Sequence, residues 1–168
     1  IISSDGKEFF IEARVAKMSK TIATLIKDLC LDEDALDGFL HEHSIPLLAV
    51  DEEQFRKALE WCEHYKDADL QEETEDEQHD PTVPEWDMEF LKLDDSELFG
   101  LMMASHYLGL DRLTRNIART IAAEIKACKD VYEIRARFNI VSDFTEEEER
   151  AIQEENDAWR RANGVNEE

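Results

Sequence analysis

The longest apolar-rich segment of the chain spans residues 83–125, and it limits the folds that the chain can adopt. Gly109 divides this segment into two predicted helices. The second helix carries a single apolar stripe about 120° wide, which is the pattern of a helix with one buried side. The stripe consists of Leu110, Leu113, Ile117, Ile121 and Ile125.

The first of these two helices, expected to start near Asp95, is apolar on two sides. At roughly 100° per residue, Leu98, Leu101, Met102, Ser105 and Leu108 fall on one face. The second face consists of Phe99, Met103, His106 and Tyr107. A helix of this kind lies in the middle of a core, or between its own domain and a partner.

Short apolar segments near the N-terminus predict a small sheet. Asp5-Gly6 is a strong hairpin signal between the apolar residues that flank it, and residues 45–48 resemble an edge strand that tolerates Pro46. Helices are expected after the capping residues Ser19 and Asp51. The predicted fold class is therefore α+β, with a three-stranded sheet packed against helices.

The charge of the chain excludes several classes of partner. With 42 acidic and 19 basic residues the formal net charge is -23, which repels nucleic acid and anionic membrane surfaces. No segment approaches the roughly 18 apolar residues that a spanning helix needs. Residues 67–80 contain no Lys or Arg, so we expect a disordered acidic insert over about 67–82. Basic protein surfaces are the natural electrostatic match.

No motif indicates an enzyme, a cofactor or a metal site. Cys30, Cys62 and Cys128 have no CxxC spacing, which favours reduced thiols in the cytoplasm or nucleus. Cys62 falls on the apolar stripe of the helix that follows Asp51, which indicates a core residue. The histidines of residues 41–43 could hold a metal, but a solvated loop is the favoured interpretation. The chain has no phosphate-binding loop and no hydrolase or metalloprotease motif.

The C-terminal segment predicts a charged helix with two large apolar residues. Thr145 and Glu148 form a capping box, so the four glutamates that follow Thr145 mark a helix start rather than a catalytic cluster. Ile152 and Trp159 lie seven residues apart, on one face of this helix. They need a surface that covers them, either from the body of the protein or from a partner.

Four sequence motifs together resemble one family. In order they are ALEWCEHYKD, VPEWDMEFLKLD, LFGLMMASHYLGLDRL and EIRARFNIVSDFTEEEE. They resemble the Skp adaptor family, the linker subunit of SCF ubiquitin ligases. The resemblance implies a BTB/POZ fold over residues 1–127 and a helical F-box-binding extension over residues 128–168. It also implies a non-catalytic adaptor that bridges a cullin to F-box proteins in ubiquitin-dependent degradation, in the cytoplasm and nucleus.

The resemblance also assigns binding residues. Met103, His106 and Tyr107 match the cullin-contacting positions. The F-box surface matches Ile121, Ile125, Phe138, Ile140, Ile152 and Trp159. His106 stands where the family usually has Asn, and the tail reads ENDAW instead of ENQW, which favours a divergent paralogue.

Two other functions remain open from the residues. In the first, the chain is a self-associating POZ protein that has lost cullin binding, with Phe99, Met103 and Tyr107 buried in a weak homodimer. In the second, it is an ion-binding or chaperone-like protein that acts through the acidic residues 67–80. An adaptor tolerates deletion of those residues, whereas the second alternative predicts loss of activity.

Overall fold

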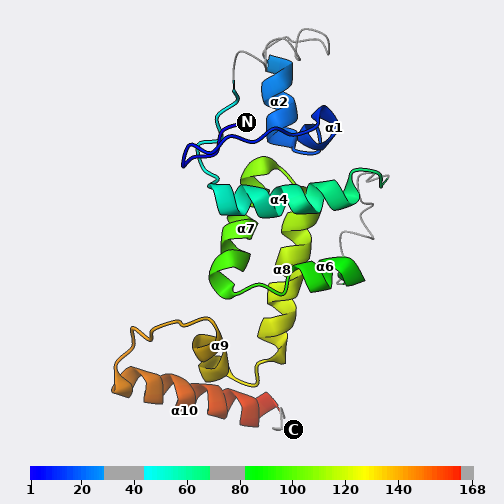
Figure 1. Ribbon diagram of the computed structural model, residues 1–168. Helices are drawn as coiled ribbons and strands as arrows, with labels where there is room; N and C mark the ends of the chain where they lie inside the picture. The colour runs from blue at the N-terminus through cyan, green and yellow to red at the C-terminus, as the bar shows by residue number, and fades with distance from the viewer. Residues whose placement is uncertain (29–43, 69–81, 164–168) are drawn as a thin grey trace. The chain divides into compact units, whose positions relative to one another are not determined.

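The computed structural model describes residues 1–28, 44–68 and 82–163 (Figure 1). The chain forms two compact units, Ile1–Ala127 and Cys128–Glu168, and each is described by itself. The first unit contains the helices α1 (Ala13–Ala16), α2 (Lys20–Asp28), α4 (Glu52–Tyr65), α6 (Glu85–Phe90), α7 (Asp95–Leu108) and α8 (Asp111–Ala127). The second unit contains α9 (Val131–Arg137) and α10 (Glu146–Asn163).

The described residues contain no sheet, so the prediction of an α+β BTB/POZ fold with a three-stranded sheet is wrong for this structure. The first unit is built from helices. Backbone hydrogen bonds join residues 1–4 to residues 7–9 and to residues 45–50, but among the described residues this pairing gives only isolated bridges, from Ile2 to Glu8 and from Ile2 to Pro46.

Pairing between these segments stops because the neighbouring backbone groups have other partners. The Ser3 carbonyl accepts a hydrogen bond from the Gly6 N–H (2.9 Å) inside the turn. The Lys7 N–H donates to the Ser3 hydroxyl (3.1 Å) instead of extending the ladder. The Asp5-Gly6 turn signal between apolar residues predicted a hairpin, but these local hydrogen bonds limit its pairing to one bridge.

The helix starts that the sequence placed on capping residues are confirmed. In each case the side chain of the first residue accepts a hydrogen bond from the backbone N–H three residues later. The pairs are Ser19 with Ile22 (3.2 Å), Asp51 with Gln54 (2.9 Å) and Thr145 with Glu148 (3.3 Å).

The break between the two central helices lies at Gly109, as predicted. Gly109 has a φ of 68°, in the left-handed region that favours glycine. Its N–H donates to the His106 carbonyl (3.1 Å), and the Leu110 N–H donates to the Ser105 carbonyl (2.9 Å). These two bonds form a Schellman motif, which ends α7 and fixes the direction in which α8 leaves.

The core of the first unit lies where α4 and α8 pack against α7 (Figure 1). Of the two apolar faces predicted for α7, the one with Leu98, Leu101 and Leu108 lies in the core, where these three residues are at most 2% exposed. Burial decreases along α8: Ile117 is fully buried, but Ile125 is 41% exposed. Figure 1 shows the last turns of α8 extending beyond α6 and α7.

A buried carboxylate joins three helices of the first unit. Asp87 of α6 has no exposed surface. It accepts hydrogen bonds from the Trp61 Nε1–H of α4 (2.9 Å), the Asn116 amide of α8 (2.7 Å) and the Tyr65 hydroxyl (3.2 Å). Arg119 donates in turn to the Asn116 amide oxygen (3.0 Å). Because buried polar groups are costly without partners, this network fixes α6 against both neighbours.

The second unit turns sharply between its two helices. Asn139 has a φ of 51°, and the Ile140 N–H donates to the Arg135 carbonyl (2.8 Å), so α9 also ends in a Schellman motif. Arg135 of α9 and Glu149 of α10 form an ion pair (2.7 Å). The Ser142 hydroxyl, from the connection, donates to the same Glu149 carboxylate (2.6 Å).

Several sequence predictions fall outside the described residues. They concern Cys30, the candidate metal ligands of residues 41–43 and residues 69–81 of the acidic insert.

We expect Gly109→Ala to lower the free energy of unfolding by about 2 kcal/mol, because a left-handed backbone is strained with a Cβ. The added Cβ would also lie 2.8 Å from the Lys20 Cβ. Gly100→Ala is the matched control, since its Cβ meets only the movable end of Gln54 and alanine favours the helix. Urea denaturation followed by circular dichroism measures both. Equal midpoints for the two variants would contradict this account.

We expect Asp87→Ala to cost about 3 kcal/mol of stability, because it leaves the Trp61 and Asn116 donors buried without an acceptor. Glu89→Ala on the same helix removes an exposed ion pair with Lys92 and should change stability by no more than about 0.5 kcal/mol. The same denaturation experiment compares them. An Asp87→Ala midpoint as high as that of Glu89→Ala would refute the structural role of the carboxylate.

Candidate protein-interaction surfaces

The side of α7 that points away from the core carries an exposed apolar surface. Met103 is 69% exposed, Phe99 is 42% exposed, His106 is exposed and Tyr107 is half-buried. These four residues, called the α7 outer face below, share one side of the helix because residues three and four apart are neighbours. The structure therefore brings Met103, His106 and Tyr107 together on one surface.

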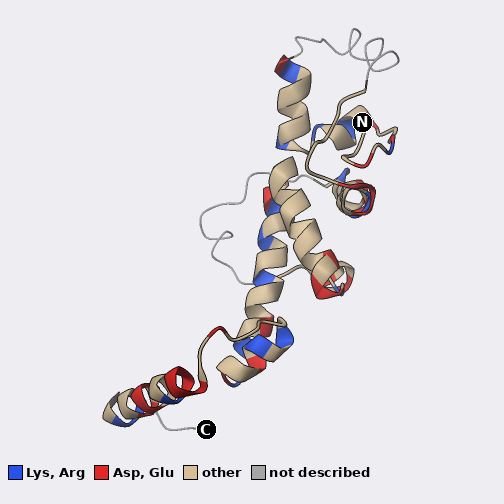
Figure 2. Cartoon of the chain, turned by 90° about the vertical axis from the view of Figure 1, so that its left-hand side faces the viewer, with Lys and Arg blue, Asp and Glu red and all other residues tan. Residues whose placement is uncertain are grey.

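The two central helices differ in their content of charged residues. After its first turn α7 carries no Lys, Arg, Asp or Glu, while Lys and Arg recur along α8 (Figure 2). A partner of the α7 outer face would therefore gain most from burying apolar and aromatic side chains rather than from ion pairs.

The six predicted F-box residues are divided between the two units. Ile121 and Ile125 lie on α8 of the first unit, where Ile121 is half-buried against the core and Ile125 is exposed. The other four lie in the second unit. Phe138 is half-buried, and Ile140, Ile152 and Trp159 are 53%, 42% and 62% exposed.

The second unit holds its shape without a core of its own in its described part. None of residues 128–162 is fully buried. Its polar connections instead converge on Glu149, whose pKa is lowered by the Ser142 hydroxyl and by the Arg135 guanidinium. Large apolar side chains on such a unit stay available to a partner.

The second unit has further exposed apolar residues that were not predicted from the sequence. They are Val131, Tyr132, Val141 and Phe144, which are between 47% and 87% exposed. For Phe144 the sequence signal pointed the other way, because an apolar residue before a helix cap such as Thr145 often packs onto the first turns. For the other three, spacing gives no indication of exposure.

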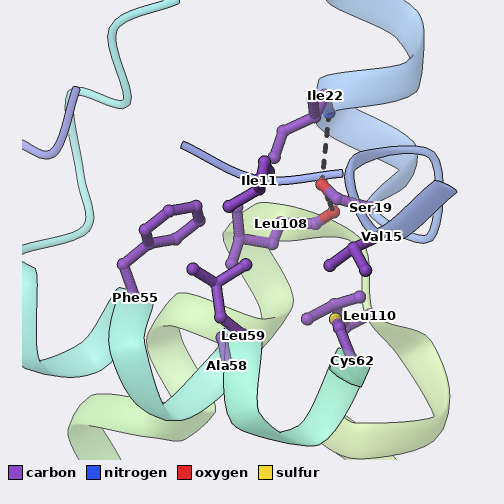
Figure 3. Close-up of a pocket in the computed structure, with 10 residues that line it drawn as sticks. All are labelled: Ile11, Val15, Ser19, Ile22, Phe55, Ala58, Leu59, Cys62, Leu108 and Leu110. Atoms are coloured by element: carbon purple, nitrogen blue, oxygen red, sulfur yellow. Dashed lines mark hydrogen bonds between the residues drawn. The ribbon is translucent and has the colours of Figure 1, made fainter. Parts of the chain in front are cut away.

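The cavity in the core of the first unit is not a ligand site. It measures about 10 Å³, room for at most one water molecule, and its lining is mainly apolar (Figure 3). Cys62 lines it and is 4% exposed, which confirms the prediction of a core residue. Burial raises the pKa of the Cys62 thiol to about 12, and the Glu63 charge adds to the rise. A thiol that stays protonated at neutral pH is a poor nucleophile.

The described parts of the chain contain neither a metal-binding cluster nor a membrane-spanning helix. There, no group of three or more His, Cys, Asp or Glu side chains is arranged to hold a metal ion. None of the helices described is both long enough and apolar enough to cross a membrane.

Comparison with known proteins places both ends of the chain in one family. Residues 1–67 match the Skp1 family tetramerisation domain, and residues 111–159 match the Skp1 family dimerisation domain. The chain is 38% identical over 161 residues to a Skp1-related protein of Caenorhabditis elegans, covering 95% of this chain and 89% of the relative.

Two fungal relatives give the same result. Suppressor of kinetochore protein 1 of Schizosaccharomyces pombe is 36% identical over 162 residues, which is 94% of each chain. The E3 ubiquitin ligase complex SCF subunit sconC of Arthroderma otae is 36% identical over 166 residues, 94% of this chain and 91% of the relative. Since these matches extend over nearly the whole sequence, the chain belongs to the Skp1 family.

Proposed function

We propose that this protein is an adaptor subunit of an SCF-type cullin ubiquitin ligase and bridges a cullin to F-box substrate receptors. The observation that carries the proposal is the match over 94% of the chain to a relative named as an SCF subunit. The adaptor is non-catalytic, in keeping with a Cys62 thiol that is buried and protonated. We place this role in the cytoplasm and nucleus.

We assign the α7 outer face to the cullin. Its Met103, His106 and Tyr107 are the residues that the sequence resemblance singled out, and the exposure of Met103 supports the assignment. Methionine and tyrosine are favoured at protein interfaces because they bury much area with adaptable or amphipathic side chains. His106 can donate a hydrogen bond to the partner from the same surface.

We assign the F-box contact to the end of α8 and to the second unit. The residues concerned are Ile121, Ile125, Phe138, Ile140, Ile152 and Trp159. Exposure of Ile125, Ile140, Ile152 and Trp159 supports this assignment, because an apolar side chain gains about 25 cal/mol per Å² of surface that a partner removes from water. Trp159 is the largest of them and the best candidate for an anchor.

Self-association is the second candidate function. The exposed Met103 and Phe99 would also be covered by a second copy of the chain, and the two matched family domains are described as tetramerisation and dimerisation domains. Size-exclusion chromatography at dilute concentration separates the two functions. An adaptor dimer should dissociate or give way to an F-box peptide, whereas a dedicated homodimer should persist.

We expect Tyr107→Ala and Trp159→Ala to weaken different partners. Binding is measured with two probes, a cullin N-terminal domain and an F-box peptide. Loss of an interface anchor should raise the Kd for its own partner at least about tenfold, or about 1.4 kcal/mol, and leave the other Kd nearly unchanged. Phe10→Ala is the control, because Phe10 is 96% exposed and outside both surfaces. If wild type bound neither probe, the adaptor proposal would be abandoned.

We also expect F-box binding to order the tail and to bury Ile152 and Trp159. Hydrogen exchange of the α10 amides should slow when the F-box peptide is added, because a unit without buried residues opens readily when it is alone. The fluorescence emission of Trp159 should shift to shorter wavelength. Trp159→Phe is the control, because its emission comes from Trp61 and Trp86 alone. Unchanged exchange and emission in the complex would rule out this coupled ordering.

A further inference from the structure

Three consecutive residues at the start of α2 contact the end of α7. The Ser19 hydroxyl donates to the Leu108 carbonyl (2.6 Å), and the Thr21 hydroxyl donates to the Tyr107 carbonyl (2.6 Å). Between them, Lys20 lies against Gly109 so closely that a Cβ at Gly109 would be 2.8 Å from the Lys20 Cβ. Figure 3 shows the bond from Ser19 to Leu108.

These contacts complete the hydrogen bonding of the last turn of α7. The final four carbonyls of a helix have no partner within the helix. In α7 the carbonyls of Ser105 and His106 accept from the backbone of the Schellman turn, as described above. The remaining two, those of Tyr107 and Leu108, accept from the hydroxyls of α2. Two of the last four carbonyls of α7 therefore obtain their hydrogen bonds from residues at the start of α2.

The two hydroxyls differ in what else they do. Ser19 is 3% exposed, and its side chain also caps α2 by accepting from the Ile22 N–H (3.2 Å). Its loss would disturb the core and the helix start together. Thr21 is half-buried, and its hydroxyl reaches across to the backbone of Tyr107. Thr21 is thus the residue whose removal affects the α7 outer face most selectively.

We propose that Thr21 is a positioning residue for cullin binding: its hydroxyl holds the Tyr107 carbonyl and thereby fixes the direction of the Tyr107 and His106 side chains. This inference rests on the proposed assignment of the α7 outer face to a cullin. Without the bond, the last turn of α7 can fray, and the interface residues must be ordered again on binding, which costs affinity.

The test compares four variants for their Kd toward a cullin N-terminal domain and toward an F-box peptide. Thr21→Val keeps the branched shape but removes the hydroxyl, and Thr21→Ser restores it. Thr24→Val is the matched control, because Thr24 is exposed on the same helix. Tyr107→Ala reports on the assigned surface itself. Melting temperatures are recorded for every variant.

The expected result separates positioning from general stability. Thr21→Val should raise the cullin Kd about fivefold, the order of one lost hydrogen bond, and leave the F-box Kd unchanged. Thr21→Ser and Thr24→Val should bind both partners like wild type. The melting temperature of Thr21→Val should fall by no more than the loss of one hydrogen bond explains, because the rest of the fold is unchanged.

Four outcomes would overturn the inference. If Tyr107→Ala weakens cullin binding but Thr21→Val does not, the positioning role alone is wrong. If Thr21→Val weakens binding of both partners equally, the effect is general destabilisation. If Thr21→Ser fails to bind like wild type, the methyl group of Thr21 matters and the hydroxyl is not sufficient. If Tyr107→Ala leaves cullin binding intact, the surface assignment is wrong and the inference is lost with it.

Discussion

The buried carboxylate of Asp87 is the interaction on which the first unit depends most. A short helix such as α6 cannot hold its place by its own backbone bonds, because isolated short helices are unstable in water. The hydrogen bonds from Trp61 and Asn116 tie it to α4 and α8, whose other sides pack against α7. The α7 outer face is therefore displayed on a rigid support, which reduces the entropy lost when a partner binds it.

The sequence predicted most of the helical structure because helix signals are local. The caps at Ser19, Asp51 and Thr145 and the break at Gly109 each depend on residues within one turn. The sheet was predicted wrongly because the turn itself uses groups that pairing needs: the Lys7 N–H donates to the Ser3 hydroxyl, and the Ser3 carbonyl accepts from the Gly6 N–H. Nothing near Asp87 in the sequence indicates that its partners lie 26 and 29 residues away.

Candidate site residues were predictable to different degrees. The periodicity of α7 separated two apolar faces, and the structure shows that one lies in the core while the α7 outer face is largely exposed. The role of Thr21 had no signal, because Thr21 and Tyr107 are 86 residues apart and the contact is between a side chain and a carbonyl. Such contacts depend on the tertiary arrangement of two helix ends, which the spacing of apolar residues in the sequence does not determine.

The two units differ in how freely their sequences can change. In the first, a substitution among the buried residues disturbs packing that every helix shares, so most changes there are costly. In the second, none of residues 128–162 is fully buried, and few contacts penalise a new side chain. Duplicated copies of such a gene can therefore diverge in the tail while the helical body stays foldable. Sequence change would then be concentrated in the last quarter of the chain.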